Sequence, residues 1–190
     1  MPKVVPEYKE IAKKKIIKAA VNIFSNKGFH KSTMDEIAGE VGVSKATLYT
    51  YFKNKEAILK EIWELSSENI LDLKKTYNNY DCFEVLEELY YMIAKSPGLH
   101  LSFEITALSP HNKNIKKINN ESYEAKLESL KLFLEDQQEK TNIRDDIEAE
   151  VLAQIITALY TDVTTQLLIG INNEVVHEKW IKSVKAVLEK

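Results

Sequence analysis

The chain has 190 residues, 44% of them hydrophobic, which is enough to bury a core and argues against intrinsic disorder. Its formal net charge is −3 at pH 7. A single cysteine, Cys82, excludes a disulfide framework and a cysteine-based zinc cluster, and we predict that it is a small buried apolar side chain. The N-terminus lacks the apolar core of a secretory signal, and threonine and glutamine make residues 151–171 too polar for a membrane span. We expect a cytoplasmic protein without a membrane partner.

The charge is unevenly distributed along the chain. Residues 1–55 hold 11 lysines and 5 acidic residues, whereas residues 56–190 hold 15 basic and 24 acidic ones. This asymmetry suggests a basic head that meets a polyanion, carried by a body that a polyanion would repel. A run of solvated lysines is the alternative interpretation.

The apolar residues recur at helical spacing, and only 5 glycines and 4 prolines interrupt them. We therefore predict an all-α fold of about nine helices. The first helix covers about residues 8–27 and ends at Gly28.

Two short helices are expected next. Thr33 and Glu36 form the capping box of the second helix, Gly42 permits a sharp turn, and Ser44 caps the third helix. Residues 33–52 thus form two short helices joined by a tight turn.

The third helix has two different faces. Leu48 and Phe52 fall on one side and are expected to dock this helix onto the first two. The opposite side and its margin are small, hydroxyl-bearing or aromatic, with one charge: Lys45, Ala46, Thr47, Tyr49, Thr50 and Tyr51. Such a face can approach a duplex closely and donate to phosphates or base edges. Lys53 and Lys55 follow beside the next helix start, where phosphate anchoring is the natural interpretation.

The stretch "IIKAAVNIFSNKGFHKSTMDEIAGEVGVSKATLYTYFKNKEAIL", residues 16–59, resembles the DNA-binding domain of the TetR family of transcriptional regulators. The matching features include A-x-x-x-F and the glycine after the first helix, T-x-x-x-I-A, G-V-S, T-L-Y-x-Y-F and K-N-K-E. The resemblance covers the first quarter to third of the chain.

The resemblance implies a homodimer that places its third helix in the major groove of a palindromic operator. By position, the implied DNA contacts are Thr33, Lys45, Ala46, Thr47, Tyr49, Thr50 and Tyr51, with Lys55 on a phosphate. Ala46 departs from the glycine that the family often has there, so the preferred bases do not follow from the resemblance. The family favours a repressor over an activator.

Two domains are predicted: a DNA-binding domain at residues 10–70, and a larger helical domain for ligand binding and dimerisation at residues 71–190. Helices are expected at about 55–78, 82–95, 98–108, 112–139, 146–171 and 174–189. We predict Asp145 with Glu148 as a capping pair for the helix at 146–171.

The last two helices are the predicted homodimer interface. The helix at 146–171 has an apolar arc and an opposite arc of threonine and glutamine, which suggests that both are buried. The final helix carries Val176, Trp180, Val184 and Val187 on one stripe, and the pairs would pack as a four-helix bundle. The family places its dimer contact in the same helices. Burial within the monomer is the alternative, because periodicity does not separate a core from an interface.

A small-molecule inducer is also implied by the resemblance, with a pocket among the middle helices. The candidate lining residues are Trp63, His100, Phe103, Glu104, Tyr123, Tyr160 and Asp162. Each taken singly fits a packing or surface role, since aromatic residues at helical spacing usually pack. A carboxylate such as Asp162 beside an apolar arc needs a partner: a cationic ligand, a hydroxyl or a lysine across the dimer.

The sequence also bears on two other classes of protein. The chain has no nucleotide-binding, zinc-protease or nucleophile motif, and its four histidines lack metal-ligand spacing, so we expect no catalytic residues, no metal and no cofactor. An architectural protein that binds DNA without regulating transcription is the second alternative. Sequence-specific binding that a ligand releases would distinguish a regulator from it.

Overall fold

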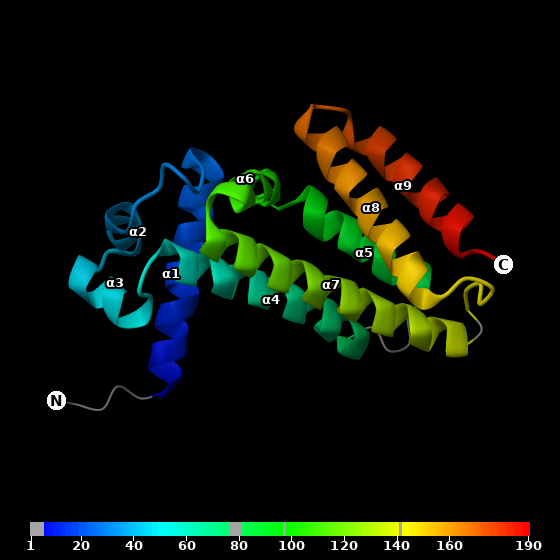
Figure 1. Ribbon diagram of the computed structural model, residues 1–190, viewed down its shortest axis with the longest axis horizontal. Helices are drawn as coiled ribbons and strands as arrows, with labels where there is room; N and C mark the ends of the chain where they lie inside the picture. The colour runs from blue at the N-terminus through cyan, green and yellow to red at the C-terminus, as the bar shows by residue number, and fades with distance from the viewer. Residues whose placement is uncertain (1–5, 77–80, 97, 141) are drawn as a thin grey trace. The chain divides into compact units, whose positions relative to one another are not determined.

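The computed structural model describes residues 6–76, 81–96, 98–140 and 142–190, and within these ranges it contains helices and no strand (Figure 1). The α-helices are α1 Pro6–Lys27, α2 Met34–Val41, α3 Lys45–Tyr51, α4 Lys55–Thr76, α5 Cys82–Ala94, α6 Leu101–Leu108, α7 Lys113–Glu139, α8 Ala149–Leu168 and α9 Asn173–Leu188. A short 3-10 helix, Ser109–His111, follows α6. The predicted all-α fold of about nine helices is confirmed.

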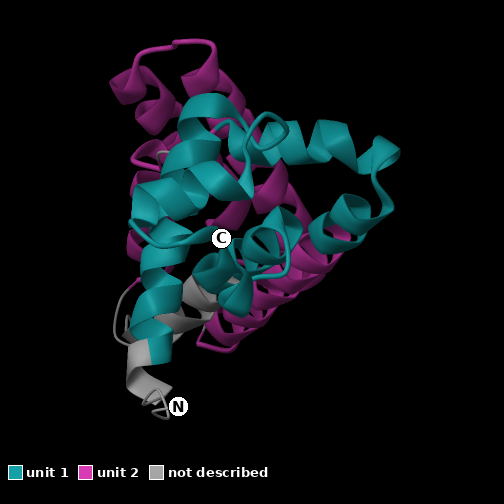
Figure 2. Ribbon diagram, turned by 90° about the vertical axis from the view of Figure 1, so that its left-hand side faces the viewer, with its two compact units in different colours: residues 1–65, 100–119 teal, residues 66–99, 120–190 magenta. Residues whose placement is uncertain are grey.

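The chain forms two compact units, shown in different colours in Figure 2. Unit 1 comprises the described part of residues 1–65 together with residues 100–119, and unit 2 comprises residues 66–99 and 120–190. Helix α6 therefore belongs to unit 1, although the boundary drawn at residue 70 assigns it to the second domain. The physical reason is burial, because Leu101 and Ile105 of α6 and Ile115 of α7 are part of the unit 1 core.

The core of unit 1 is built on α1, which packs against α2, while α2 packs against α3. Phe24 of α1 and Ile37 of α2 are fully buried. Leu48 is also fully buried and Phe52 is 4% exposed, as their spacing predicts. These contacts hold α3 by one side.

The turns around α2 follow the sequence signals. Thr33 and Glu36 form the predicted capping box, and the side chain of Ser44 accepts the N–H of Thr47 as the cap of α3. Gly42 has a φ of 77° and Gly28 a φ of 85°, a left-handed backbone that favours glycine. Local sequence thus determines where α2 and α3 begin and how the chain turns between them.

Unit 2 packs α5, α8 and α9 around one core. Val176, Trp180 and Val184 of α9 are nearly or fully buried within this unit, and Val187 packs against the same core. The apolar stripe of α9 is therefore buried within a single copy of the chain. This burial is the alternative that the sequence left open. Cys82 is buried in this core, as predicted.

Helix α8 begins at Ala149, three residues after the predicted start, and ends at Leu168. Its N-cap is Glu148, with no side-chain hydrogen bond, and so the predicted capping pair of Asp145 with Glu148 is wrong. Within the described ranges, α8 alone has the length and apolar composition of a membrane-crossing helix. Its residues Leu152 and Ile156 are buried in the unit 2 core, as in any helix of a packed helical domain.

Candidate nucleic-acid interface

The exposed face of α3 carries five of the predicted contact residues. Lys45, Ala46, Thr47, Tyr49 and Thr50 are all exposed, and Tyr49 has 46% of its surface accessible. The buried Leu48 lies on the other side of the helix. A short helix anchored by one side and offering small, hydroxyl and phenol groups on the other has the form of a major-groove reading helix.

The hydroxyls of this face are ordered by their own helix. The Oγ atoms of Ser44 and Thr47 lie 2.8 Å apart, and Thr50 donates to the carbonyl of Thr47 at 2.6 Å. A threonine hydroxyl that donates once can still accept through its lone pairs. The face can therefore accept hydrogen bonds from base edges without side-chain rearrangement.

Lys45, the one cation of α3, is paired with an acidic residue of α2. Its Nζ lies 2.7 Å from Oδ1 and 3.0 Å from Oδ2 of Asp35, and both side chains are exposed. The hydrogen bond and charge of Asp35 raise the pKa of Lys45 above its ordinary value. Lys45 therefore stays protonated and is held near the start of α2.

Two other predicted contacts have local structural roles. The hydroxyl of Thr33 donates to Oε2 of Glu36 and accepts the main-chain N–H of the same residue, which leaves it little capacity for DNA. Tyr51 is half-buried and packs against the unit 1 core. Thr33 thus caps α2, and Tyr51 contributes to the packing of unit 1.

Lys55, the predicted phosphate contact, has hydrogen-bond partners within unit 1. Its ammonium donates to the carbonyls of Phe29, His30 and Ser32 at 2.8, 3.0 and 3.0 Å. It also lies 4.7 Å from the centroid of the Phe29 ring. Because an ammonium has three N–H donors, these carbonyls use all of them.

Glu104 binds the same turn from α6. Its two carboxylate oxygens accept the main-chain N–H groups of Phe29 at 2.7 Å and His30 at 2.9 Å. The turn between α1 and α2 is thus held through its carbonyls by Lys55 and through its N–H groups by Glu104. Glu104, a predicted ligand contact, uses both carboxylate oxygens within unit 1 to hold this turn. No local sequence signal marks this contact, since its partners are about 75 positions away.

The remaining ligand candidates are divided between the units. Trp63, His100 and Phe103 belong to unit 1, whereas Tyr123, Tyr160 and Asp162 belong to unit 2. Phe103, Tyr123 and Tyr160 are exposed. Asp162 is also exposed and accepts a hydrogen bond from Nε2 of Gln166.

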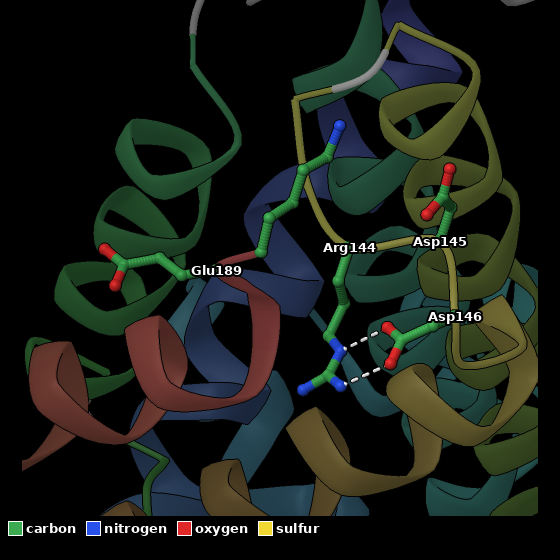
Figure 3. Close-up of a pocket in the computed structure, with 5 residues that line it drawn as sticks. Arg144, Asp145, Asp146 and Glu189 are labelled. Carbon is green, nitrogen blue, oxygen red and sulfur yellow. Dashed lines mark hydrogen bonds and ion pairs between the residues drawn. The ribbon is translucent and has the colours of Figure 1, made fainter.

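Described residues of unit 2 line two pockets. One, of about 20 Å³ between α8 and α9, is lined by Asp162 and by the buried Trp180, and it has room for about one water molecule. The other, of about 300 Å³, is lined by Arg144, Asp145, Asp146, Glu189 and Lys190 (Figure 3).

Figure 3 shows Arg144 directed at Asp146, with Glu189 pointing away. Nε and Nη2 of Arg144 bind the two oxygens of Asp146 at 2.7 Å each, and Arg144 lowers the pKa of Asp146. The guanidinium of Arg144 is therefore already paired with Asp146, and none of the predicted ligand residues lines this pocket.

The anchored α3, its exposed polar face and the tight turn before it define a helix-turn-helix DNA-binding protein. Residues 16–62 match the family of bacterial regulatory proteins named tetR. These residues therefore form a TetR-family DNA-binding domain.

Curated relatives support this assignment. The chain is 34% identical over 84 residues to the HTH-type transcriptional regulator AcrR of Shigella flexneri, covering 43% of this chain and 39% of AcrR. It is 34% identical over 83 residues to IcaR of Staphylococcus epidermidis, a negative transcriptional regulator of the biofilm operon icaADBC, covering 44% of each. The chain thus spans less than half the length of these relatives. Both are regulators, which supports the prediction that the chain is not an enzyme.

The fold extends over the whole chain. The structure of Salmonella enterica GusR superposes with a TM-score of 0.78 at 22% identity, covering 98% of this chain and 99% of GusR. Escherichia coli NemR in its reduced form superposes with a TM-score of 0.77 at 18% identity, covering 94% and 98%.

Proposed function

We propose that this chain is a sequence-specific transcriptional regulator, a repressor that binds a palindromic operator as a homodimer in the cytoplasm and leaves it when a small molecule binds. The observation that carries this proposal is the exposed face of α3. Lys45, Ala46, Thr47, Tyr49 and Thr50 lie together there, opposite the buried Leu48. A major groove admits a helix of this kind, and each base pair presents a distinct pattern of donors and acceptors in it. The negative regulation recorded for IcaR supports a repressor.

The exposed side of α8 supports a dimer. A stripe of uncharged residues with alternating spacings of three and four runs along it: Val151, Gln154, Ala158, Thr161, Thr165 and Leu168. Thr161 and Thr165 donate their hydroxyls to carbonyls one turn back in the same helix. This face can therefore be buried against a second copy without leaving those donors unsatisfied.

The exposed side of α9 has a different composition. Glu174, Glu178, Lys182 and Lys185 lie on it, and Lys182 pairs with Glu178. We therefore place the uncharged stripe of α8 at the centre of the homodimer, with the charged side of α9 at its rim. Charged groups are depleted at interface cores and tolerated at rims. Both of the last two helices contribute, as the sequence predicts.

The inducer acts, in this proposal, by changing the separation of the two α3 helices in the dimer. Two half-sites lie one helical turn or a multiple apart, so a small change in separation prevents both from being read together.

Selection of bound duplexes from genomic fragments tests the DNA-binding function. We expect a palindromic site bound by the dimer, and loss of its binding in Tyr49→Ala, as measured by gel shift with sedimentation of the same sample. Leu132→Ala, which truncates an exposed side chain on α7, is the matched control and should bind normally. Recovery of no common site, with an affinity that depends on salt alone, would favour an architectural protein. Compounds that release the selected duplex identify the inducer.

A further inference from the structure

Lys45, the one cation of α3, forms an ion pair with the acidic side chain of Asp35. Asp35 lies in the first turn of α2, is exposed, and contacts Nζ of Lys45 through both of its carboxylate oxygens. Carboxylates are repelled by the phosphates of a duplex, so an exposed aspartate at this position weakens binding unless it has a compensating role.

The geometry leaves Lys45 partly available. The ammonium has three N–H donors, and the two contacts with Asp35 leave one for another acceptor. Guanine presents O6 and N7 as acceptors in the major groove, and a lysine can donate to them. Lys45 can therefore read a base edge while it stays paired, whereas a full phosphate contact requires it to leave Asp35.

We propose that Asp35 is a specificity-determining residue: its carboxylate competes with phosphates for Lys45 and so weakens binding to duplexes that lack the operator sequence. This inference rests on the proposed DNA-binding function. On a non-operator duplex the protein gains only phosphate contacts, and Asp35 removes one of them. On the operator, Lys45 donates to a base while still paired with Asp35, so the affinity there is retained.

The substitution Asp35→Asn tests the inference, since it keeps the shape and one acceptor oxygen but removes the charge. The probes are a random-sequence duplex of about 30 base pairs and the duplex recovered by selection. We expect the variant to bind the random duplex roughly two- to fivefold more tightly, a change of the size that an exposed ion pair contributes. The slope of log K against log salt concentration should become more negative by about 0.9, the value expected for one additional phosphate contact. Affinity for the selected duplex should not rise. The ratio of selected-duplex affinity to random-duplex affinity should therefore fall.

A matched control distinguishes the release of Lys45 from the general effect of removing one negative charge. Glu40→Gln makes the same change of charge on the same helix, but Glu40 is hydrogen-bonded to Asn22 of α1. It should change random-duplex binding by less than about twofold, because exposed charges away from the contact are screened by salt. An equal gain in both variants would overturn the inference and leave the DNA-binding function intact.

A double-mutant cycle shows whether Asp35 acts through Lys45. In a Lys45→Ala background, Asp35→Asn should no longer tighten random-duplex binding. A gain that persists without Lys45 contradicts the inference, and so does an unchanged random-duplex affinity in the single variant. Failure of the unmodified chain to bind any duplex, by contrast, removes the proposed function and this inference with it.

Discussion

The carboxylate of Glu104 accepts a hydrogen bond of 2.7 Å from the main-chain N–H of Phe29, a residue 75 positions earlier in the chain. The other carboxylate oxygen accepts the N–H of His30. Helix α6 thereby holds the turn that leads into α2, and the position of α2 in unit 1 depends on a contact made from outside the helix-turn-helix.

Replacing Glu104 by glutamine should weaken this turn. One of the two N–H groups would face an amide NH2 in place of an acceptor, and an unsatisfied, partly buried donor costs about 1–3 kcal/mol. Hydrogen exchange at the amides of Phe29 and His30 should accelerate, and the urea midpoint should fall. Glu124→Gln, at an exposed carboxylate on α7, is the control for loss of charge. Unchanged protection of both amides would contradict the role assigned to Glu104.

Lys55→Met should lower the free energy of unfolding, because it weakens the same turn between α1 and α2. The carbonyls of Phe29, His30 and Ser32 would lose their donor, and we expect a loss of about 1–3 kcal/mol by urea unfolding. Lys53→Met, which changes an exposed lysine two positions earlier, should stay within about 0.5 kcal/mol of the unmodified chain. Equal effects of the two substitutions would argue that Lys55 is a surface charge.

The capping box makes the start of α2 sensitive to acid. The hydrogen bond from Lys27 is the largest cause that lowers the pKa of Glu36 below its ordinary value of 4.5, and Thr33 adds to it. A lowered pKa means that the folded chain binds fewer protons than the unfolded one. This stabilisation is present above about pH 4.5 and is lost as the pH falls through the pKa of folded Glu36.

Lys27→Gln should move the pKa of Glu36 back toward 4.5 when its carboxyl carbon is titrated by NMR. Lys18→Gln, on an exposed lysine of the same helix, serves as the control and should leave that pKa in place. If the titration midpoint is at the ordinary value in the unmodified chain, the ion pair does not stabilise the cap in solution.

The α8 stripe predicts which substitution disrupts the proposed dimer. Ala158→Arg places a long cation in the centre of the uncharged stripe, and sedimentation should show monomers with retained helical circular dichroism. Ala125→Arg makes the same change at an exposed position of α7 and should leave the dimer intact. Dimers that persist in Ala158→Arg would place the interface elsewhere.

Cys82 offers a reporter of unfolding in unit 2. Burial raises the pKa of its thiol to about 12, so it has almost no reactive thiolate at neutral pH. A thiol reagent should modify it only in denaturant, at the rate at which unit 2 opens. Rapid modification of the folded chain would show that unit 2 opens readily.

The sequence alone determined those features that depend on neighbouring residues in the chain. Thr33 with Glu36, Gly42 and Ser44 specify the ends of α2 and α3 through hydrogen bonds and backbone freedom over a few residues. The spacing of Leu48 and Phe52 likewise determines which side of α3 is buried, and therefore which side is exposed.

Only the tertiary structure decided the roles of residues whose partners lie far along the chain. Lys55 and Glu104 have the types expected of a phosphate contact and a ligand contact, and both instead bind the turn at Phe29. The apolar stripe of α9 is buried in the unit 2 core, whereas the uncharged side of α8 is exposed. Charge and periodicity indicate which kinds of partner a side chain can bind. The partner that it does bind depends on long-range packing, which no local pattern encodes.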